Sequence, residues 1–307
     1  MFLSVCLNPT LQKTLSFPSI IPGTVNRTAS HRLDVSGKGI NVTRVLTQLG
    51  KKAIHLTQLG GVMRPLFLSL CEQDKLSVEW VESESQIRFC YTMLTECDDG
   101  VTELVEEAEP VSAGTEERLL ERFNSLLGDG SLGLKWLIVS GTKAAGFSDK
   151  VIPFMVQKAK EKGLKVILDI RGKDLTESLQ YRPDVVKPNL FEFASTFAPE
   201  LIKDNDLAIN SVAKEQIKSA MLEMAKKHDC RVILTNGSRK ILAADGDNYF
   251  EADINPVKAV NSIGCGDAFT AGLAAALEDG ANFNEAIAEG IRCGALNAGF
   301  VKPGVIR

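Results

Sequence analysis

The sequence predicts an α/β protein in which a central, mostly parallel sheet lies between helices. Short apolar runs recur along the chain, and they are continuous rather than alternating, as in strands covered on both faces. Segments with helical periodicity separate these runs, and this alternation favours parallel strands. The 307 residues are 44% hydrophobic and 24% charged, a globular composition that excludes a disordered, collagen-like or coiled-coil protein.

The expected strands are the apolar runs themselves. They comprise residues 1–7, 136–139, 166–168, 184–186, 231–234 and 257–260. The expected helices lie between them and show one apolar face each. They comprise a segment capped by Thr115 with its apolar face at 119–127, a segment from Ser148 to a glycine stop at Gly163, and the segments 213–227 and 268–277.

Two stretches, residues 10–35 and 86–107, break this rhythm because they contain strand and turn patterns without a helix. Within the second, Arg88–Glu96 and Val101–Val105 predict a hairpin that turns at 98–100. In an α/β chain, a small β excursion often forms a lid over the ligand cleft. No linker, repeat or low-complexity tract divides the chain, so we expect a single domain, residues 1–307, with this lid.

Charge and cysteine content indicate the kind of partner and compartment. A net charge of −4 without a basic block gives no footprint for nucleic acid or an anionic membrane, so we expect a small-molecule ligand. The 7 cysteines show no C-x-x-C spacing and the 3 histidines are scattered, which predicts neither disulfides nor a zinc site. This cysteine and histidine usage leads us to expect a reducing, cytoplasmic setting. Residues 1–7 lack a basic n-region and are too short for a signal or a membrane span, so we expect a buried strand there.

One glycine pattern misleads. Residues 128–133 match G-x-G-x-x-G, but they follow an expected helix and precede an expected strand, the reverse of a dinucleotide-binding turn. We therefore expect only a loop that ends a helix. No G-x-x-x-x-G-K-[ST] sequence occurs, which excludes a P-loop.

The segment 261–272 is the strongest indication of chemistry. Gly264 and Gly266 allow backbone N–H groups to converge, and the start of the following helix adds about half a positive charge. Such a turn binds anionic oxygens, including those of a phosphate in transfer. Asp267 falls in the first helical turn, where its carboxylate either reaches a substrate hydroxyl or only complements the helix dipole.

A second glycine turn, residues 36–44, also opens a helix, with Lys38 and Asn41 in the turn. Lysine supplies a cation, and asparagine supplies both a donor and an acceptor, which suits a polar or anionic ligand. The alternative is an ordinary strand-to-helix turn with a solvated lysine.

Together the two segments resemble the signatures of the PfkB, or ribokinase-like, carbohydrate kinases, written around G-G-K-G-x-N and D-T-x-G-A-G-D. Residues 7–14 and 23–27 resemble the N-P-[AS]-[IL]-D-x-T and G-x-x-N-R elements of the 1-phosphofructokinase and tagatose-6-phosphate kinase branch. Further matches follow in order at 102–104, 139–141 and 187–192. The resemblance implies a ribokinase-like fold and transfer of phosphate from ATP, with Mg²⁺, to a small sugar, which we expect to be a sugar monophosphate. It also implies a homodimer formed through the lid.

The resemblance assigns roles residue by residue. For catalysis it implies Asp267 as the general base, with an anion hole formed by Gly264, Cys265 and Gly266. For the nucleotide it implies Lys187, Asn189, Glu192, Thr235, Gly237, Ser238 and Asn297, although Asn297 equally fits a role in helix packing. Mg²⁺ is expected to be held through waters near Asn189 and Glu192 rather than directly, and the alternative is that these two residues only form a polar helix start after a strand. For the sugar it implies Gln12, Arg27, Gly37, Lys38, Gly39, Asn41, Arg88 and Ser140.

The chain departs from the family pattern mainly on the substrate side. The residues Gln12, Ser36, Cys90, Thr92 and Val105 stand where the branch carries Asp, Gly, Asn, Lys and Asn. Arg27, Lys38 and Arg88 remain as cations for a substrate phosphate. Two alternatives therefore stay open: a kinase for an unphosphorylated sugar or nucleoside, and a ligand-binding member without catalysis.

Two further departures concern the segment around the anion hole. Asn261 stands where relatives activated by monovalent cations carry Asp, so we expect no K⁺ activation. Cys265 replaces the usual Ala, and it is either a reactive thiol at a helix N-terminus or a small buried filler.

Overall fold

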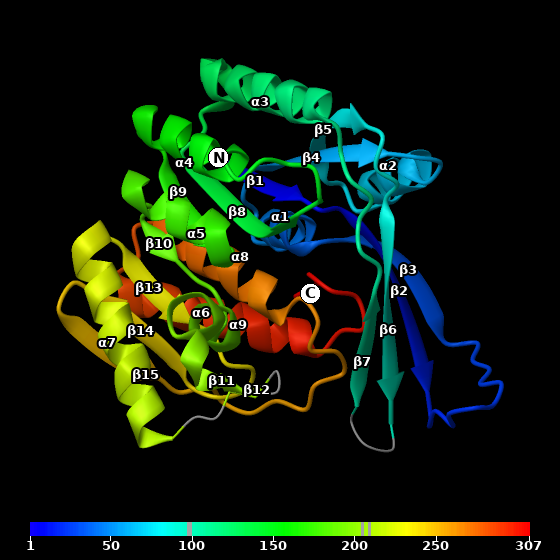
Figure 1. The fold of residues 1–307 in the computed structure, drawn as a ribbon. Coiled ribbons are helices and arrows are strands. Elements are labelled where there is room, and N and C mark those ends of the chain that lie inside the picture. Colours follow the sequence, from blue (N-terminus) through cyan, green and yellow to red (C-terminus); the bar gives the residue numbers. More distant parts are fainter. Residues whose placement is uncertain (97–99, 204–205, 208–209) are drawn as a thin grey trace.

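The computed structural model describes residues 1–96, 100–203, 206–207 and 210–307 (Figure 1). Within these ranges the main feature is a nine-stranded sheet with the order β15-β14-β13-β10-β9-β8-β1-β4-β5. Its strands are β1 (Phe2–Leu7), β4 (Ala53–Gly60), β5 (Ser77–Ser83), β8 (Trp136–Lys143), β9 (Lys165–Asp169), β10 (Val185–Val186), β13 (Arg231–Leu234), β14 (Ile241–Asp245) and β15 (Asn248–Ala252).

The strands from β5 to β13 all pair in parallel, and only β14 and β15 at the far edge are antiparallel. The expected strands at 136–139, 166–168, 184–186 and 231–234 all belong to this parallel part. Antiparallel β14 and β15 need only a tight turn, which Gly246 provides at φ +59°. The prediction of a mostly parallel sheet is confirmed.

Helices cover both faces of this sheet (Figure 1). One face packs against α3 (Ala113–Gly128), α4 (Val151–Glu161), α5 (Gly172–Ser178), α6 (Leu190–Phe197) and α7 (Ser211–His228). The other face packs against α1 (Lys38–Gln48), α8 (Cys265–Glu278) and α9 (Phe283–Ala298). The remaining short elements are η1 (Gly130–Leu132), η2 (Leu179–Tyr181), η3 (Pro199–Leu201), β11 (Ile202–Lys203) and β12 (Asp206–Leu207).

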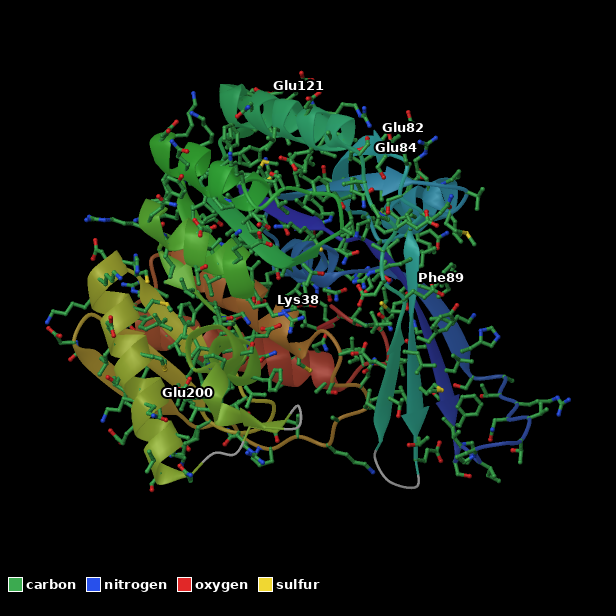
Figure 2. All side chains as sticks on the ribbon, viewed as in Figure 1. Lys38, Glu82, Glu84, Phe89, Glu121 and Glu200 are labelled. Atoms are coloured by element: carbon green, nitrogen blue, oxygen red, sulfur yellow. The ribbon has the colours of Figure 1, made fainter. Side chains whose placement is uncertain are left out.

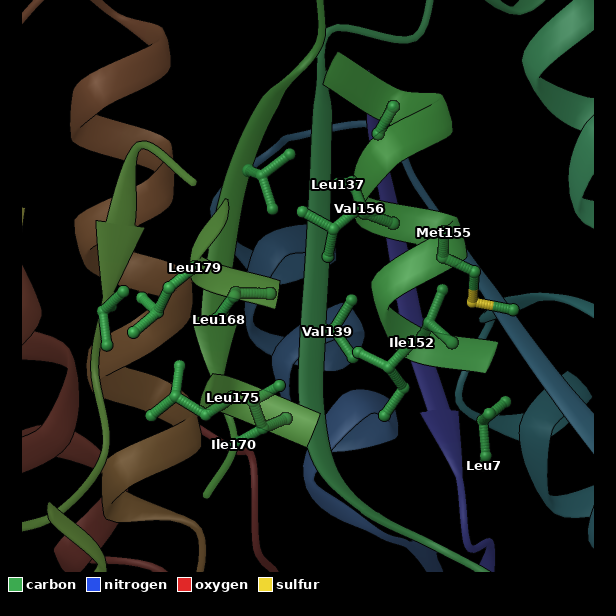
Figure 3. Packing of buried hydrophobic residues seen from close by; sticks show 14 of the residues in the cluster. Leu7, Leu137, Val139, Ile152, Met155, Val156, Leu168, Ile170, Leu175 and Leu179 are labelled. Carbon is green, nitrogen blue, oxygen red and sulfur yellow. The ribbon is translucent and has the colours of Figure 1, made fainter. Parts of the chain in front are cut away.

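Successive side chains of a strand point to opposite faces of the sheet, so the core consists of two layers, one on each face. In β8, Leu137 and Val139 pack against Ile152 and Val156 of α4 (Figure 3), whereas Ile138 points into the layer of α8. All of these side chains are at most 2% exposed. This double coverage explains why the strands are continuous apolar runs.

A separate four-stranded sheet has the order β3-β2-β6-β7 and projects beside the body of the molecule (Figure 1). Its strands are β2 (Thr10–Phe17), β3 (His31–Ser36), β6 (Arg88–Thr95) and β7 (Val101–Val105). We call it the small sheet. The expected hairpin is present as the antiparallel pair β6–β7, and residues 98–99 of its turn lie outside the described residues. The helix α2 (Arg64–Gln73) packs under the small sheet through Phe67.

The strand expected at 257–260 is wrong, because residues 253–260 follow β15 as an extended loop. The backbone N–H of Val260 donates to the carbonyl of Ala298 at the end of α9 (2.7 Å), so it does not enter a ladder. Pro256 has no backbone N–H to offer a neighbouring strand. Val257 and Val260 are consequently exposed.

Two helix starts also differ from the prediction. The helix α3 begins at Ala113, before Thr115, whose hydroxyl donates instead to Glu84 (2.9 Å). The helix α4 begins at Val151, and Ser148 lies in the preceding turn, where its hydroxyl accepts from the N–H of Lys150. Gly163 ends that segment at φ +75°, as expected.

Three further observations concern the described part of the chain. The G-x-G-x-x-G match spans the end of α3 and the 3₁₀ turn η1 before β8, so it only ends a helix. Every cysteine described is a free thiol. None of the described helices combines the length and the apolar character that crossing a membrane requires.

Candidate active site

The carboxyl ends of the parallel strands meet the N-termini of α1 and α8 around one cavity of about 350 Å³. Asp169 ends β9, Lys187 follows β10 and Thr235 follows β13, so all three reach the same edge of the sheet. Ligands of open α/β sheets bind at this edge. Lys38, near the centre of Figure 2, begins α1 and faces the same space.

The N-terminus of α8 forms one wall of the cavity. Gly264 precedes the helix at φ +84°, where a side chain would also meet the backbone N of Gly304 at 3.0 Å. Only glycine fits this turn. The first N–H groups of any α-helix lack intrahelical acceptors, so the turn offers them, together with the positive end of the helix dipole, to an anion.

Asp267 lies in the first turn of α8, lines the cavity and is 6% exposed. Its Oδ2 accepts a hydrogen bond from Nδ2 of Asn41 at 2.8 Å. Burial raises the pKa of Asp267 to about 6, and the charge of Asp169 adds to the rise, whereas Lys38 and the bond from Asn41 oppose it. The carboxylate therefore exchanges its proton closer to neutral pH than an ordinary aspartate does, a property that suits a general base.

Asp169, a second buried carboxylate near Asp267, interacts with two lysines and two hydroxyls. It pairs with Lys187 at 3.2 Å and Lys38 at 3.4 Å, and it accepts from the hydroxyls of Ser140 and Thr270. Burial alone would raise its pKa, but the two lysines and the hydrogen bonds hold the pKa below its usual range. Asp169 is not among the site residues expected from the sequence, although a carboxylate at the end of a buried parallel strand is a usable signal.

Asn189 and Glu192 form a reciprocal capping box at the start of α6. Oδ1 of Asn189 accepts from the N–H of Glu192 (2.7 Å), and Oε2 of Glu192 accepts from the N–H of Asn189 (2.9 Å). The other carboxylate oxygen of Glu192 accepts from Lys38 at 3.1 Å. Burial works against the charge of Lys38, yet Asp169 and Glu192 raise its pKa, so it stays cationic.

A second cavity, of about 500 Å³, adjoins the first, and both are lined by Asn189, Thr235, Ser262 and Gly266. Its lining is mostly apolar and comes from the loop after β15 and from α8 and α9. The side chains that give it this character are Ile241, Ile254, Pro256, Val257, Phe269 and Ile291. Gly237 and Ser238 also line it. A long cavity that is apolar at one end and polar at the other suits a nucleotide with its phosphates toward Gly266.

The small sheet closes the opposite side of the first cavity. Gln12, 3% exposed, donates from Nε2 to the hydroxyl of Thr92 at 2.6 Å. Arg88 donates from Nη1 to the carbonyl of Glu106, and its buried Nε has no partner among the described residues. Glu103 of β7 also lines the cavity, and burial raises its pKa against the opposing charge of Arg88.

A comparison with known protein families shows to which family the chain belongs. Residues 6–302 match the family described as pfkB family carbohydrate kinase. The chain belongs to this family. It is thus a sugar kinase, a phosphotransferase with an alcohol group as acceptor.

Several solved structures have the same fold as this chain. Phosphofructokinase-2 from Escherichia coli, in complex with potassium, superposes with a TM-score of 0.85 at 21% identity, covering 99% of this chain and 94% of that one. A possible 1-phosphofructokinase from Thermotoga maritima gives 0.84 at 19% identity, with 97% and 91% covered. Ribokinase from Thermotoga maritima gives 0.70 at 18% identity, with 98% and 94% covered. These likenesses show the ribokinase-like fold.

Most of the residues assigned from the sequence meet around the two cavities of the kinase. The first is lined by Gln12, Gly37, Lys38, Asn41, Arg88, Lys187, Asn189, Glu192, Thr235, Gly264, Gly266 and Asp267, and the second also by Gly237, Ser238 and Cys265. Lys38 and Asn41 lie within α1 rather than in the turn before it, because Gly37 is already the N-cap.

Four of the assigned residues lie outside both linings. Arg27 is in the exposed segment between β2 and β3. Gly39 is buried against His55, and Ser140 donates to Asp169 beneath the cavity. Asn297 donates to the carbonyl of Ile263 and accepts from the N–H of Gly304, so it fastens the loop before α8.

The two other departures have structural roles. Asn261 accepts from the N–H of Ile263 and donates to the carbonyl of Val301, which fixes the turn before α8. Burial raises the pKa of the Cys265 thiol, so the structure favours a small filler over a reactive thiolate.

Proposed function

We propose that this kinase transfers the γ-phosphate of ATP to a primary hydroxyl of a sugar monophosphate, as a 1-phosphofructokinase or tagatose-6-phosphate kinase does. One observation carries the proposal. The carboxylate of Asp267 and the N-terminus of α8 lie where the polar cavity meets the mostly apolar one, with Gly266 lining both. An acceptor in the first cavity and a nucleotide in the second would place the transferred phosphate beside Asp267.

In the proposed reaction Asp267 accepts the proton of the acceptor hydroxyl, and that oxygen forms a bond to the γ-phosphorus. The bond from phosphorus to the bridging oxygen breaks, and ADP leaves. Most of the work is positioning and charge stabilisation. Backbone N–H groups at 264–267 would hold the transferring oxygens, and Lys38 and Lys187 would add positive charge.

A hydrated Mg²⁺ fits the residues present. Among the described residues no cluster of three or more His, Cys, Asp or Glu could enclose a metal ion, so an ion would be held mainly by phosphate oxygens and waters. The carboxylate of Glu192 and the amide of Asn189 line the cavity where those waters would lie. When bound, Mg²⁺ would neutralise charge on the phosphate oxygens.

The acceptor's own phosphate is the finer part of the proposal. Phosphofructokinase-2 from Escherichia coli, similar in fold, is known in complex with fructose 6-phosphate. Arg88 supports an anion here, because its buried Nε lacks a partner among the described residues. Glu103 favours the second candidate, an unphosphorylated sugar or nucleoside, because a carboxylate in the same lining repels a phosphate.

We further propose that the small sheet is the lid of a single domain, residues 1–307, and that two lids pair in a homodimer. Leu104 and Val105 on the edge strand β7 are 53% and 52% exposed. An exposed edge with apolar side chains invites pairing with a second strand. Arg27 lies on the same small sheet's connecting segment, so a dimer could bring it to a phosphate that it does not reach within one chain.

The test is ATP turnover with Mg²⁺ on a panel of sugar monophosphates, free sugars and nucleosides, with Asp267→Asn run alongside. We expect turnover on a hexose monophosphate, and a loss of about 10²–10⁴-fold in the variant with its fold intact. Turnover only on unphosphorylated acceptors would transfer the assignment to the second candidate. A folded protein that binds nucleotide but turns over no acceptor would support the non-catalytic alternative.

A further inference from the structure

Arg44 lies behind the site, outside the lining of both cavities, and is 4% exposed. Its Nη1 donates to Oδ1 of Asn41 and to the carbonyl of Pro303, both at 2.9 Å. Its Nη2 donates to the carbonyl of Val35 at 2.8 Å, and Nε donates to Asp74 at 3.0 Å. Acceptors from four segments therefore fix this guanidinium.

The fixed guanidinium determines which way the Asn41 amide points. Arginine only donates hydrogen bonds, so the amide oxygen must face it and the NH₂ group must face the other way. That NH₂ group lies 2.8 Å from Oδ2 of Asp267 and 3.4 Å from the hydroxyl of Ser36. A flipped amide would set its NH₂ against Arg44 and its oxygen against the carboxylate, which is unfavourable at both ends.

We propose that Arg44 is a positioning residue for phosphoryl transfer, which acts through Asn41 to orient the Asp267 carboxylate and favour its ionised form. The inference rests on the proposed function, in which Asp267 is the base. A donor on one carboxylate oxygen leaves the other free for the acceptor hydroxyl and stabilises the charged base. Arg44 itself touches no reacting atom.

Other charged groups lie near Asp267 and near Arg44. Asp267 is faced by Lys38 of α1, by Asp169 at the end of β9 and by Lys187 after β10. Arg44 is faced by Asp74, which follows α2 and also pairs with Lys302 of the C-terminal segment. Lys302 lies 3.4 Å from Asp34 as well. Because Asp74 keeps Lys302 as a partner, Arg44 can be replaced without leaving that carboxylate unpaired.

The test is the pH profile of kcat/KM for Arg44→Lys, which keeps the charge but loses the fork that grips Asn41. We expect the acid limb to move up by about one pH unit and kcat at pH 7 to fall about tenfold, because a misplaced carboxylate is less well aligned with the acceptor hydroxyl. The KM for ATP should change less than about twofold, since Arg44 lies away from the nucleotide cavity. Arg231→Lys, at another arginine bound to a carboxylate, is the matched control and should leave the profile unchanged.

A double-mutant cycle separates positioning from general destabilisation. In an Asn41→Ala background, Arg44→Lys should shift the acid limb no further, because the residue through which it acts is gone. An unshifted limb in the single variant, or an equal shift in both backgrounds, would overturn the proposal.

Two more variants keep the outcome decisive. If Arg44→Lys does not fold, Asn41→Leu replaces it, since this neutral side chain of similar size neither accepts from Arg44 nor donates to Asp267; its acid limb should also rise without any added charge, and an unchanged limb overturns the proposal. Asp267→Asn tests the proposed function separately. If that variant keeps full turnover, the base assignment itself fails, whereas its inactivity with an unshifted Arg44→Lys profile refutes only the relay.

Discussion

Asn41 donates a hydrogen bond to Asp267 at 2.8 Å, although the two residues are 226 positions apart in the chain. The bond joins the first turn of α8 to α1, so the two glycine-rich segments form one site. It also gives the buried carboxylate a neutral donor, which lowers its pKa without adding another charge. The Asp267 carboxylate is therefore buried, oriented and still able to ionise near neutral pH.

Turnover should depend on pH through Asp267. The base must be a carboxylate to accept a proton, and its pKa is raised to about 6, so kcat/KM should rise with pH up to about 6 and level off above it. The measurement is kcat/KM for the best acceptor between pH 4.5 and 8, with ATP saturating. An acid limb near 4, the range of an ordinary exposed aspartate, would contradict a buried base.

The same raised pKa should make Asp267→Asn more stable than the parent above pH 6. Between 3.8 and about 6 the folded state holds a proton that the unfolded state has released, so the parent loses stability as the pH rises through this window. The shift of roughly two units corresponds to about 3 kcal/mol. Urea unfolding at pH 8 and pH 4 measures the difference, which should be largest at pH 8 and small at pH 4. A variant less stable than the parent at pH 8 would mean that Lys38 outweighs the burial.

The order of strands and helices could be predicted from the sequence because burial on both faces leaves continuous apolar runs. The two glycine segments were also recognisable, since Gly37 and Gly264 are needed for their backbone angles, φ +106° and +84°. Residues 257–260 have the composition of a strand, but they do not form one. Its backbone partner lies at the end of α9, and no local pattern reveals that contact.

Site residues that are brought together only by tertiary contacts could not be predicted from the sequence. Glu103 lines the first cavity because β7 pairs with β6, which sets it opposite Thr92. Arg44 is linked to Asp267 through Asn41, whose amide oxygen accepts from Arg44 and whose NH₂ group donates to Asp267. Nothing in their neighbouring residues distinguishes either one from an ordinary surface charge.

Asp169→Asn should be strongly destabilising. The substitution keeps the shape of the side chain but leaves Lys187, 2% exposed, without its carboxylate partner. Removing one member of a buried ion pair costs about 3–5 kcal/mol, which urea unfolding at pH 7 would detect. The matched control is Asp247→Asn, whose pair with Lys226 is exposed and whose loss should cost less than about 1 kcal/mol. Adding Lys187→Met to Asp169→Asn should recover part of the loss, and equal or greater loss would contradict the buried-charge explanation.

Gly39→Ala should be destabilising although Gly39 lies in the first turn of a helix. A Cβ there would meet Cε1 of His55 at 2.7 Å and Cβ of Cys6 at 2.8 Å, and both neighbours are buried. Overpacking of this kind costs about 1–3 kcal/mol. It should also raise the KM of the acceptor by shifting α1. Gly128→Ala, in open space in α3, is the control and should be neutral or stabilising by up to about 1 kcal/mol. The thermal unfolding midpoint should therefore fall in Gly39→Ala, and it should stay the same or rise in Gly128→Ala.

Thr92→Val should weaken binding of the acceptor and leave the nucleotide unaffected. The hydroxyl of Thr92 accepts from Nε2 of Gln12 at 2.6 Å, so it holds the Gln12 amide with its oxygen available to the cavity. One neutral hydrogen bond contributes about 1 kcal/mol, so we expect the acceptor KM to rise roughly fivefold. Thr92→Ser keeps the hydroxyl and should retain most of the affinity. Steady-state kinetics with each substrate varied in turn separates the two KM values. An unchanged acceptor KM in Thr92→Val, or an equal rise for ATP, would show that the Gln12–Thr92 pair does not select the sugar.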